Sequence, residues 1–269
     1  MKQTALGNGS DGADCRTAGV ATHVGGEGVA VPSRQDLARL FEVVVGAARA
    51  AQAVPPLEPL AQLLEADPEV VGLGVAELVG LGILVPVADG HRVAPPRDWS
   101  FQALGHLRHL QHLPEAPPVG IIARDLVDLT EEMMLWIARV APRRLSKGAL
   151  DPARHAFDRV RRCRDDPEGF VRAHHEVMRR IAEAASLLPC LALLNEMEGV
   201  YSELFQLADL RPNEAYWESV PRLLDALEAG DGDDARAVIT SFVEDARRHI
   251  VARMRGQPAD RGTRSRAVT

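Results

Sequence analysis

Two consecutive stretches with helical periodicity, between residues 170 and 205, constrain the fold more than any other part of this sequence. In the first, the apolar residues fall on one face of a helix with 100° per residue. These residues are Phe170, Val177, Met178, Ile181, Ala185 and Leu188. The second begins after Leu188-Pro189 and repeats apolar residues at three- and four-residue steps. Because Ala, Leu and Val also dominate the composition, we predict a mainly α protein.

His174 lies in the middle of the first apolar face, and the second helix contributes Tyr201. An imidazole on an inward face, beside a helix that supplies a tyrosine, suits a residue that lines a cavity. The alternative is a core histidine with one satisfied hydrogen bond. Periodicity alone favours the core histidine, and both interpretations stay open at this point.

The N-terminal part of the sequence contains three short helical segments followed by two strands. The helices are predicted from Ser33 to about residue 53, over Glu58–Glu65, and from Pro68 to about Gly80. Ser33 with Asp36 resembles a capping box, and Asp67 precedes a proline at the first helical position. The strands, Ile83–Val87 and His91–Ala94, flank a turn at Asp89-Gly90. This order is typical of a winged helix-turn-helix.

The whole chain divides into five predicted segments. Residues 1–30 form a disordered leader, 31–97 the winged helix-turn-helix, 98–118 a linker helix, 119–255 an antiparallel bundle of six to seven helices, and 256–269 a disordered tail. The linker helix, Phe101–Leu113, carries His106, His109 and His112 on one face. A metal site there is conceivable, but no Cys, Asp or Glu completes the spacing. A solvated or interdomain face is favoured instead.

Composition limits the function further. The net charge of −7 argues against indiscriminate binding to polyanions. Three cysteines without a CxxC pair fit free thiols in a reducing cytoplasm. The sequence has no apolar run of membrane-spanning length and no signal pattern at its N-terminus. We therefore expect a soluble cytoplasmic protein without a membrane partner.

Three segments together carry a resemblance to a known family. Residues 54–85 keep the apolar and glycine positions of its helix, turn, helix and wing. Arg97-Asp98-Trp99 with Leu104 is similar to its linker, and residues 194–201 (LNEMEGVY) are similar to a segment of its helical domain. The positions kept in the first segment are Pro55, Leu60, Ala61, Leu64, Val71, Leu78 and Gly82. The chain resembles GntR-family transcription regulators of the FadR-like subfamily, whose C-terminal half is the FCD domain.

The resemblance implies a homodimer whose recognition helices enter adjacent major grooves and whose helical domain senses a small effector. It does not imply an enzyme. The sequence His174-His175-Glu176 might suggest acid–base chemistry, but no nucleophile, phosphate loop or paired carboxylate motif accompanies it. Glu176 falls on the opposite, polar face of the same helix, which is typical of a surface that forms ion pairs.

The predicted winged helix-turn-helix lacks the positive charge that DNA recognition requires. Residues 50–90 contain no Lys, Arg or His, so the recognition helix supplies neither arginines for guanine nor cations for phosphates. Arg34, Arg49, His91 and Arg92 flank the module and are the candidate DNA contacts. We predict weak and strongly salt-dependent DNA binding. The alternative is a degenerate paralogue that does not bind DNA and acts as a ligand-sensing or protein-interaction dimer.

The effector site also differs from the family pattern. Where many members have an Asp-x3-His pair and two later histidines for a metal, this chain has His174, Met178, Pro221 and Asp245. Because a catalytic-type zinc site needs three ligands, we predict no metal and no other cofactor. A member of the subfamily that also lacks the metal takes an acyl-coenzyme A. The resemblance therefore implies a small apolar acid or acyl thioester, such as a fatty acid or acyl-coenzyme A, as the effector. The resemblance and the periodicity together give the candidate ligand-binding residues Thr130, Met134, Arg139, His174, Met178, Tyr201, Asp245 and His249.

Overall fold

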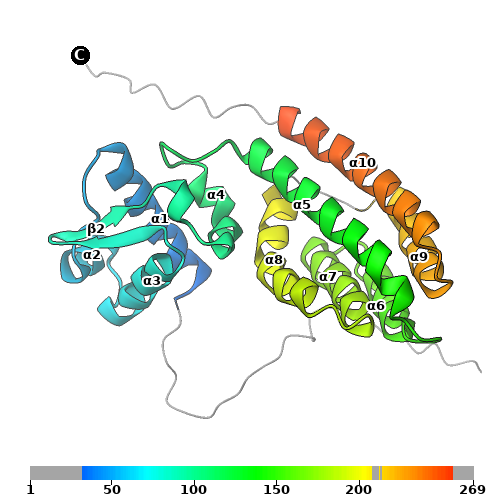
Figure 1. Ribbon diagram of the computed structural model, residues 1–269. Helices are drawn as coiled ribbons and strands as arrows, with labels where there is room; N and C mark the ends of the chain where they lie inside the picture. Colours follow the sequence, from blue (N-terminus) through cyan, green and yellow to red (C-terminus); the bar gives the residue numbers. More distant parts are fainter. Residues whose placement is uncertain (1–31, 208–211, 213, 257–269) are drawn as a thin grey trace, which may run out of the picture.

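The computed structural model describes residues 32–207, 212 and 214–256, with side chains up to residue 248. Figure 1 shows two parts that are joined by a linker. We refer to residues 32–99 as the head and to residues 119–256 as the bundle. The mainly α fold class predicted from the sequence is confirmed: the head is a winged helix-turn-helix, and the bundle is all helical.

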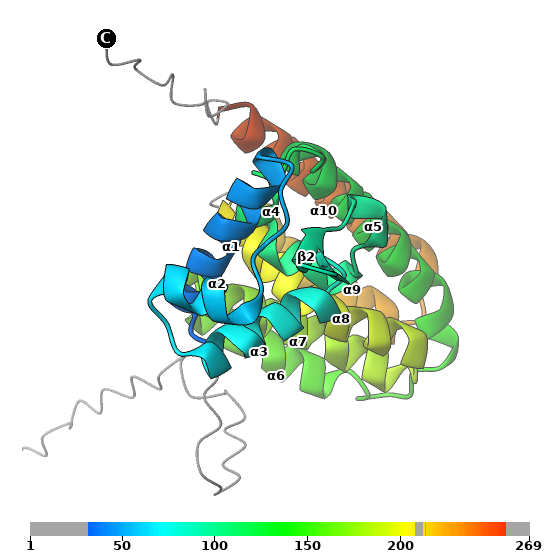
Figure 2. The same cartoon turned by 90° about the vertical axis from the view of Figure 1, so that its left-hand side faces the viewer.

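The head consists of α1 (Arg34–Arg49), α2 (Leu57–Leu64), α3 (Pro68–Gly80), β1 (Leu84–Val87) and β2 (Gly90–Val93). Both predicted N-caps form. The Ser33 side chain and Asp36 make a reciprocal capping box, and Asp67 Oδ1 accepts a hydrogen bond from the Glu69 amide at 2.8 Å. The two strands pair antiparallel, with Leu84 opposite Val93. In Figure 2 the head faces the viewer, in front of the bundle.

Two glycines in the head are required by close backbone contacts. Gly82, which follows α3, has φ = 74°, and a Cβ atom there would lie 2.3 Å from the carbonyl oxygen of Asp98. Gly90, in the hairpin turn, has φ = 128°, and a Cβ atom would lie 2.1 Å from the carbonyl oxygen of Val54. A side chain at either position would collide with backbone, in conformations that L-residues rarely adopt.

The linker differs from the continuous helix predicted over Phe101–Leu113. A short 3₁₀ turn, η1 (Pro96–Asp98), is followed by a 3₁₀ helix, η2 (Phe101–His106), and by one α-helical turn, α4 (Leu107–Leu110). Leu104, Leu107, Leu110 and Leu113 recur at intervals of three, which is the 3₁₀ period, and the last three are buried. A leucine at every third residue therefore favours a 3₁₀ helix over an α-helix. Gly105 lowers the α-helical propensity of this segment further.

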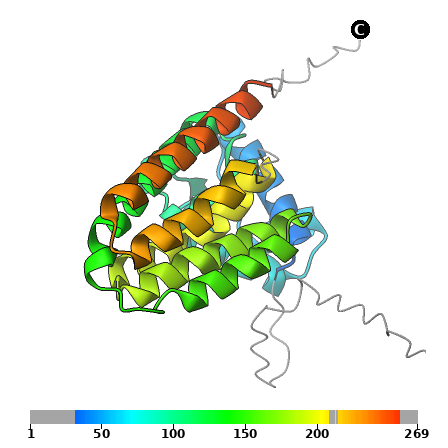
Figure 3. The same ribbon diagram turned by 90° about the vertical axis from the view of Figure 1, so that its right-hand side faces the viewer.

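The bundle is made of α5 (Val119–Val140), a 3₁₀ turn η3 (Ala141–Arg143), α6 (Asp151–Arg162), α7 (Pro167–Ala184), α8 (Leu188–Leu207), α9 (Glu214–Glu228) and α10 (Gly232–Gly256). Helix α7 packs between α6 and α8, while α10 packs between α5 and α9. Figure 3 shows these helices side by side around one interior. The core there is built mostly of Leu, Val, Ile, Met and Ala.

Two further features bear on earlier expectations. Cys190 is a buried free thiol, whereas Cys163 is disulfide-bonded, so the expectation of free thiols is wrong for Cys163. Among the described residues, no helix combines the length and the apolar character needed to cross a membrane.

Candidate functional site

The bundle encloses a cavity of about 160 Å³. Its walls come from α5, α7, α8, α9 and α10, together with Pro212 in the segment between α8 and α9. Most of the lining is apolar, and three methionines (Met133, Met134 and Met178) contribute flexible side chains. An apolar cavity with a few polar groups inside a helical bundle is a typical small-molecule site.

Six of the eight predicted ligand-binding residues line this cavity: Thr130, Met134, His174, Met178, Tyr201 and Asp245. Arg139 does not line it and is exposed on α5. The reason is rotation along the helix, because Arg139 is nine residues after Thr130 and therefore about 180° around the axis. The side chain of His249 lies outside the described residues.

His174 is both a cavity residue and a satisfied histidine, so the two interpretations of the sequence are compatible. Its Nδ1 lies 2.9 Å from the hydroxyl oxygen of Tyr216, which belongs to α9. Burial lowers the pKa of His174 to about 4, so the imidazole is neutral near pH 7. Burial likewise raises the pKa of Tyr216, which keeps its phenol protonated. The sequence analysis did not select Tyr216, although Tyr216, Val220, Leu223 and Leu227 have the spacing of a buried helix face.

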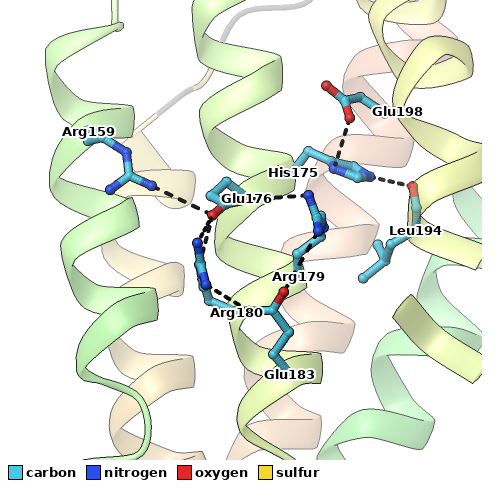
Figure 4. A network of polar contacts seen from close by, with 8 residues as sticks. All are labelled: Arg159, His175, Glu176, Arg179, Arg180, Glu183, Leu194 and Glu198. Carbon is cyan, nitrogen blue, oxygen red and sulfur yellow. Dashed lines mark hydrogen bonds and ion pairs between the residues drawn. The ribbon is translucent and has the colours of Figure 1, made fainter. Parts of the chain in front are cut away.

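The neighbouring His175 also lines the cavity, and the sequence analysis did not select it. This residue is buried, and its Nε2 donates a hydrogen bond to the carbonyl oxygen of Leu194 at 2.6 Å, which links α7 to α8. Its Nδ1 lies 3.9 Å from Glu198, and burial lowers its pKa. Figure 4 shows these contacts beside the outer face of α7.

That outer face carries the ion-pair network that the sequence predicted around Glu176. Arg180 approaches Glu176 at 2.7 Å, Arg179 at 3.7 Å, and Arg159 reaches it from α6 at 3.9 Å. Glu183 pairs with Arg179 and Arg180. Figure 4 shows Glu176 among these arginines, and it is not among the residues that line the cavity. The network therefore holds α6 and α7 together and does not form part of the site.

A second polar pair lies at the α5–α8 wall of the cavity. Thr130 Oγ1 donates a hydrogen bond to the carbonyl oxygen of Leu126 at 2.7 Å. The same oxygen is hydrogen-bonded to the hydroxyl of Tyr201, which must then be the donor. Burial raises the pKa of Tyr201, so this phenol also stays protonated.

The positions that match the family's metal ligands do not converge on a metal site. His174, Met178 and Asp245 line the cavity, whereas Pro221 lies inside α9 and has no donor atom. Within the described part of the chain, no group of three His, Cys, Asp or Glu side chains is placed to hold a metal ion. A thioether, one imidazole and one carboxylate are a poor donor set for zinc.

The linker and the bundle are joined by an ion pair whose carboxylate is buried and whose arginine is partly exposed. Glu203 of α8 is buried, and its carboxylate accepts hydrogen bonds from Arg108 Nε and Nη2, both at 2.7 Å. The backbone amide of Arg108 donates to the same carboxylate at 2.9 Å. Tyr201, which lines the cavity, is two residues before Glu203 on α8. One helix therefore connects the cavity wall to the linker.

The surface of α3 that a DNA reader would present carries Glu69, Leu73 and Ala76, all exposed. Neither Leu nor Ala donates hydrogen bonds to base edges, and a carboxylate repels phosphates. Leu63 on the adjacent α2 is 62% exposed. This face is therefore acidic and apolar.

The four candidate DNA contacts are not brought together. Arg34 and Arg49 lie at opposite ends of α1, which are about 22 Å apart in a helix of this length. Arg34 lies 3.7 Å from Glu168, and Arg49 Nε donates to the carbonyl oxygen of His112 at 3.3 Å. On β2, Arg92 is exposed, while His91 is half-buried and its backbone pairs with Val54.

Two of the three linker histidines, His106 and His109, face the head, while His112 is exposed. His109 stacks on Phe41 of α1 with ring centroids 4.7 Å apart, and His106 Nε2 lies 3.6 Å from Glu77 of α3. Burial lowers the pKa of both imidazoles. These residues form part of the contact between the linker and the head.

The chain thus combines a winged helix-turn-helix with a helical bundle that contains an apolar cavity. Residues 125–245 match the FCD domain family. The match covers most of the bundle, and the winged helix-turn-helix lies on its N-terminal side.

Solved structures with a similar fold include GntR from Streptococcus agalactiae, with 16% identity, a TM-score of 0.42, and coverage of 80% of this chain and 98% of that chain. Another is McbR/YncC from E. coli, with 13% identity, a TM-score of 0.44, and coverage of 80% and 97%. A GntR family member from Pseudomonas syringae pv. tomato has 15% identity, a TM-score of 0.42, and coverage of 84% and 91%. No curated protein has significant sequence similarity to the chain.

Proposed function

We propose that this chain is a GntR-type transcription regulator of the FadR-like group. It senses a small apolar acid or acyl thioester in the cavity of its bundle, and it acts as a cytoplasmic homodimer. The observation that carries the proposal is the enclosed apolar cavity with neutral hydrogen-bonding groups at His174, Thr130 and Tyr201. Buried apolar walls provide affinity for hydrocarbon, and a few polar groups fix its orientation.

The position of Arg139 bears on the choice between an acid and a thioester. The only arginine expected at the site is exposed on the far side of α5, and no Lys or Arg is among the described residues that line the cavity. A carboxylate moved into this lining would lose hydration without gaining an opposite charge. This favours an uncharged acyl group over a free carboxylate.

The ion pair between Arg108 and Glu203 supports a route from the cavity to the head. A ligand that displaces the Tyr201 hydroxyl would shift α8, and Glu203 on the same helix holds the linker. Such a shift changes the head only if the ligand binds the two arrangements with different affinity. We propose that α8 carries this difference.

A second candidate function is supported by the exposed face of α3. Glu69, Leu73 and Ala76 present acid and apolar surface where a DNA reader presents cations. A paralogue that keeps the sensor and dimerises, or captures a protein partner through the head, would have such a face.

The sensing proposal is tested by the melting temperature of the full chain in the presence of fatty acids and acyl thioesters. Binding to the folded state alone raises the melting temperature, and His174→Ala should reduce the rise. His155→Ala is the matched control, because His155 is exposed on α6. Stabilisation by zinc or nickel, with no effect of any apolar compound, would overturn the assignment. Native mass spectrometry of the same samples reports dimerisation.

A further inference from the structure

The aromatic rings of this chain are concentrated around the cavity. The sequence has only six Phe, three Trp and two Tyr in 269 residues. Both tyrosines and three of the six phenylalanines line the cavity: Phe170, Phe205, Phe242, Tyr201 and Tyr216. Aliphatic residues and methionine build most of the rest of the core, where Phe157 is a buried ring that does not line the cavity.

Four of these rings form one wall with His174. Phe170 meets Tyr216 edge-on with centroids 5.1 Å apart, and Phe205 lies 6.0 Å from Phe170. Phe242 lies 5.9 Å from Tyr216. The imidazole of His174 is parallel to the ring of Phe170, at an interplanar angle of 6°. These separations are within the range at which rings attract, so a flat guest would meet ring faces and edges already held in place.

The volume of the cavity limits the size of the ligand. A cavity of about 160 Å³ is close in volume to an engineered apolar protein cavity of about 150 Å³ that binds benzene. One ring with a small substituent fits such a space without rearrangement of the walls. A long acyl chain fits only if the helices move apart.

His174 offers the one clear polar anchor at the ring wall. Its Nδ1 is engaged by Tyr216, while its Nε2 makes no hydrogen bond to any described residue. A neutral imidazole has one donor and one acceptor nitrogen, so Nε2 can pair with either a hydroxyl or a carbonyl group. Desolvation lowers the pKa of this histidine to about 4, which keeps that pairing available near pH 7.

We propose that the cavity binds a single-ring aromatic compound that carries one hydroxyl or carbonyl substituent. The ring lies among Phe170, Phe205 and Phe242, and the substituent oxygen pairs with His174 Nε2. This inference rests on the proposed sensing function and narrows its ligand class from apolar acyl compounds in general to those with one aromatic ring.

The test compares ring and chain probes on the full chain. Benzyl alcohol, acetophenone and octan-1-ol, which are all uncharged at pH 7, are titrated. Dissociation constants are taken from the shift in melting temperature and from tryptophan fluorescence, to which Trp217, 5.1 Å from Tyr216, contributes. We expect at least one ring compound to bind about tenfold or more tightly than octan-1-ol.

A ring-removing variant sharpens this result. Phe242→Leu should weaken the ring compound about threefold to tenfold and leave octan-1-ol unchanged, since only ring contacts are lost. Phe101→Leu is the matched control, because Phe101 packs on the bundle core but does not line the cavity. Tighter binding of octan-1-ol than of both ring compounds would overturn the single-ring inference and leave the sensing function standing. No binding of any probe at millimolar concentration would overturn both.

Discussion

Helix α3 of the head and helix α7 of the bundle differ in how well their side chains suit the ligand that each helix would contact. Both keep buried residues that fix their place in the fold. These are Val71, Val75 and Leu78 in α3, and Val177 and Ile181, which also line the cavity, in α7. Their functional faces diverge. The outward face of α3 carries Glu69 and Leu73, which do not suit DNA, whereas the inward face of α7 keeps His174 and Met178 around a cavity. Buried positions thus preserve architecture independently of the chemistry that the architecture presents.

The largest expected effect is on the stability of the head, and it tests the close backbone contact at Gly82. Gly82→Ala forces a side chain to φ = 74° and against the carbonyl of Asp98, so it should destabilise the head by about 3 kcal/mol. Hydrogen exchange of residues 57–99 measures this. Gly46→Ala is the control: nothing lies within 4 Å of the new Cβ atom, and α1 should gain up to about 1 kcal/mol. Equal effects of the two variants would mean that the wing does not depend on this contact.

A smaller effect is expected at the junction of the two parts. Arg108→Ala leaves the buried carboxylate of Glu203 without its main partner, which should cost about 2 kcal/mol. Adding Glu203→Leu should recover part of that loss, because no uncompensated charge remains. Chemical denaturation of both variants gives the comparison. Arg124→Ala, at an exposed pair with Asp125, is the control and should change stability by less than about 0.5 kcal/mol.

The cavity predicts a pH effect of about 1–2 kcal/mol at pH 5. His174 has a folded pKa of about 4, below the ordinary 6.5, so the unfolded chain takes up a proton first as the pH falls. The stability contributed by neutral His174 is complete above pH 6.5 and is lost progressively towards pH 4. In His174→Gln this contribution disappears, and the loss of melting temperature between pH 7 and pH 5 should be smaller than in the wild type. His155→Gln should behave like the wild type, since His155 is exposed.

The sequence predicted the elements of both parts because their signals are local. Ser33 and Asp67 are caps that depend on neighbours within three residues, and the apolar stripes depend on a 3.6-residue period. The cavity wall was predicted only in part, because which residues meet depends on partners from five helices. Tyr216 is 42 residues from His174, and nothing local pairs them. Arg139 does not line the cavity because it lies about 180° around α5 from Thr130, and the family resemblance alone does not fix this rotation.

The smallest expected effect is on DNA affinity. It tests whether the lack of positive charge on α3 is the reason that the head binds DNA weakly. The wild type should bind duplex DNA weakly at about 0.15 M salt, with a dissociation constant of about 10⁻⁶ M or higher. Leu73→Arg places a cation on the exposed face of α3 without touching the core, and it should tighten binding about tenfold at about 0.05 M salt. Most of this gain should vanish at about 0.2 M salt, because one more phosphate contact steepens the salt dependence.

Leu188→Arg, on the bundle at 74% exposure, controls for the added charge itself and should have little effect. A nanomolar, sequence-selective complex of the unmodified chain would instead show that Arg34, Arg92 or the wing compensates for α3, and the contrast between the two helices would no longer describe a difference in function.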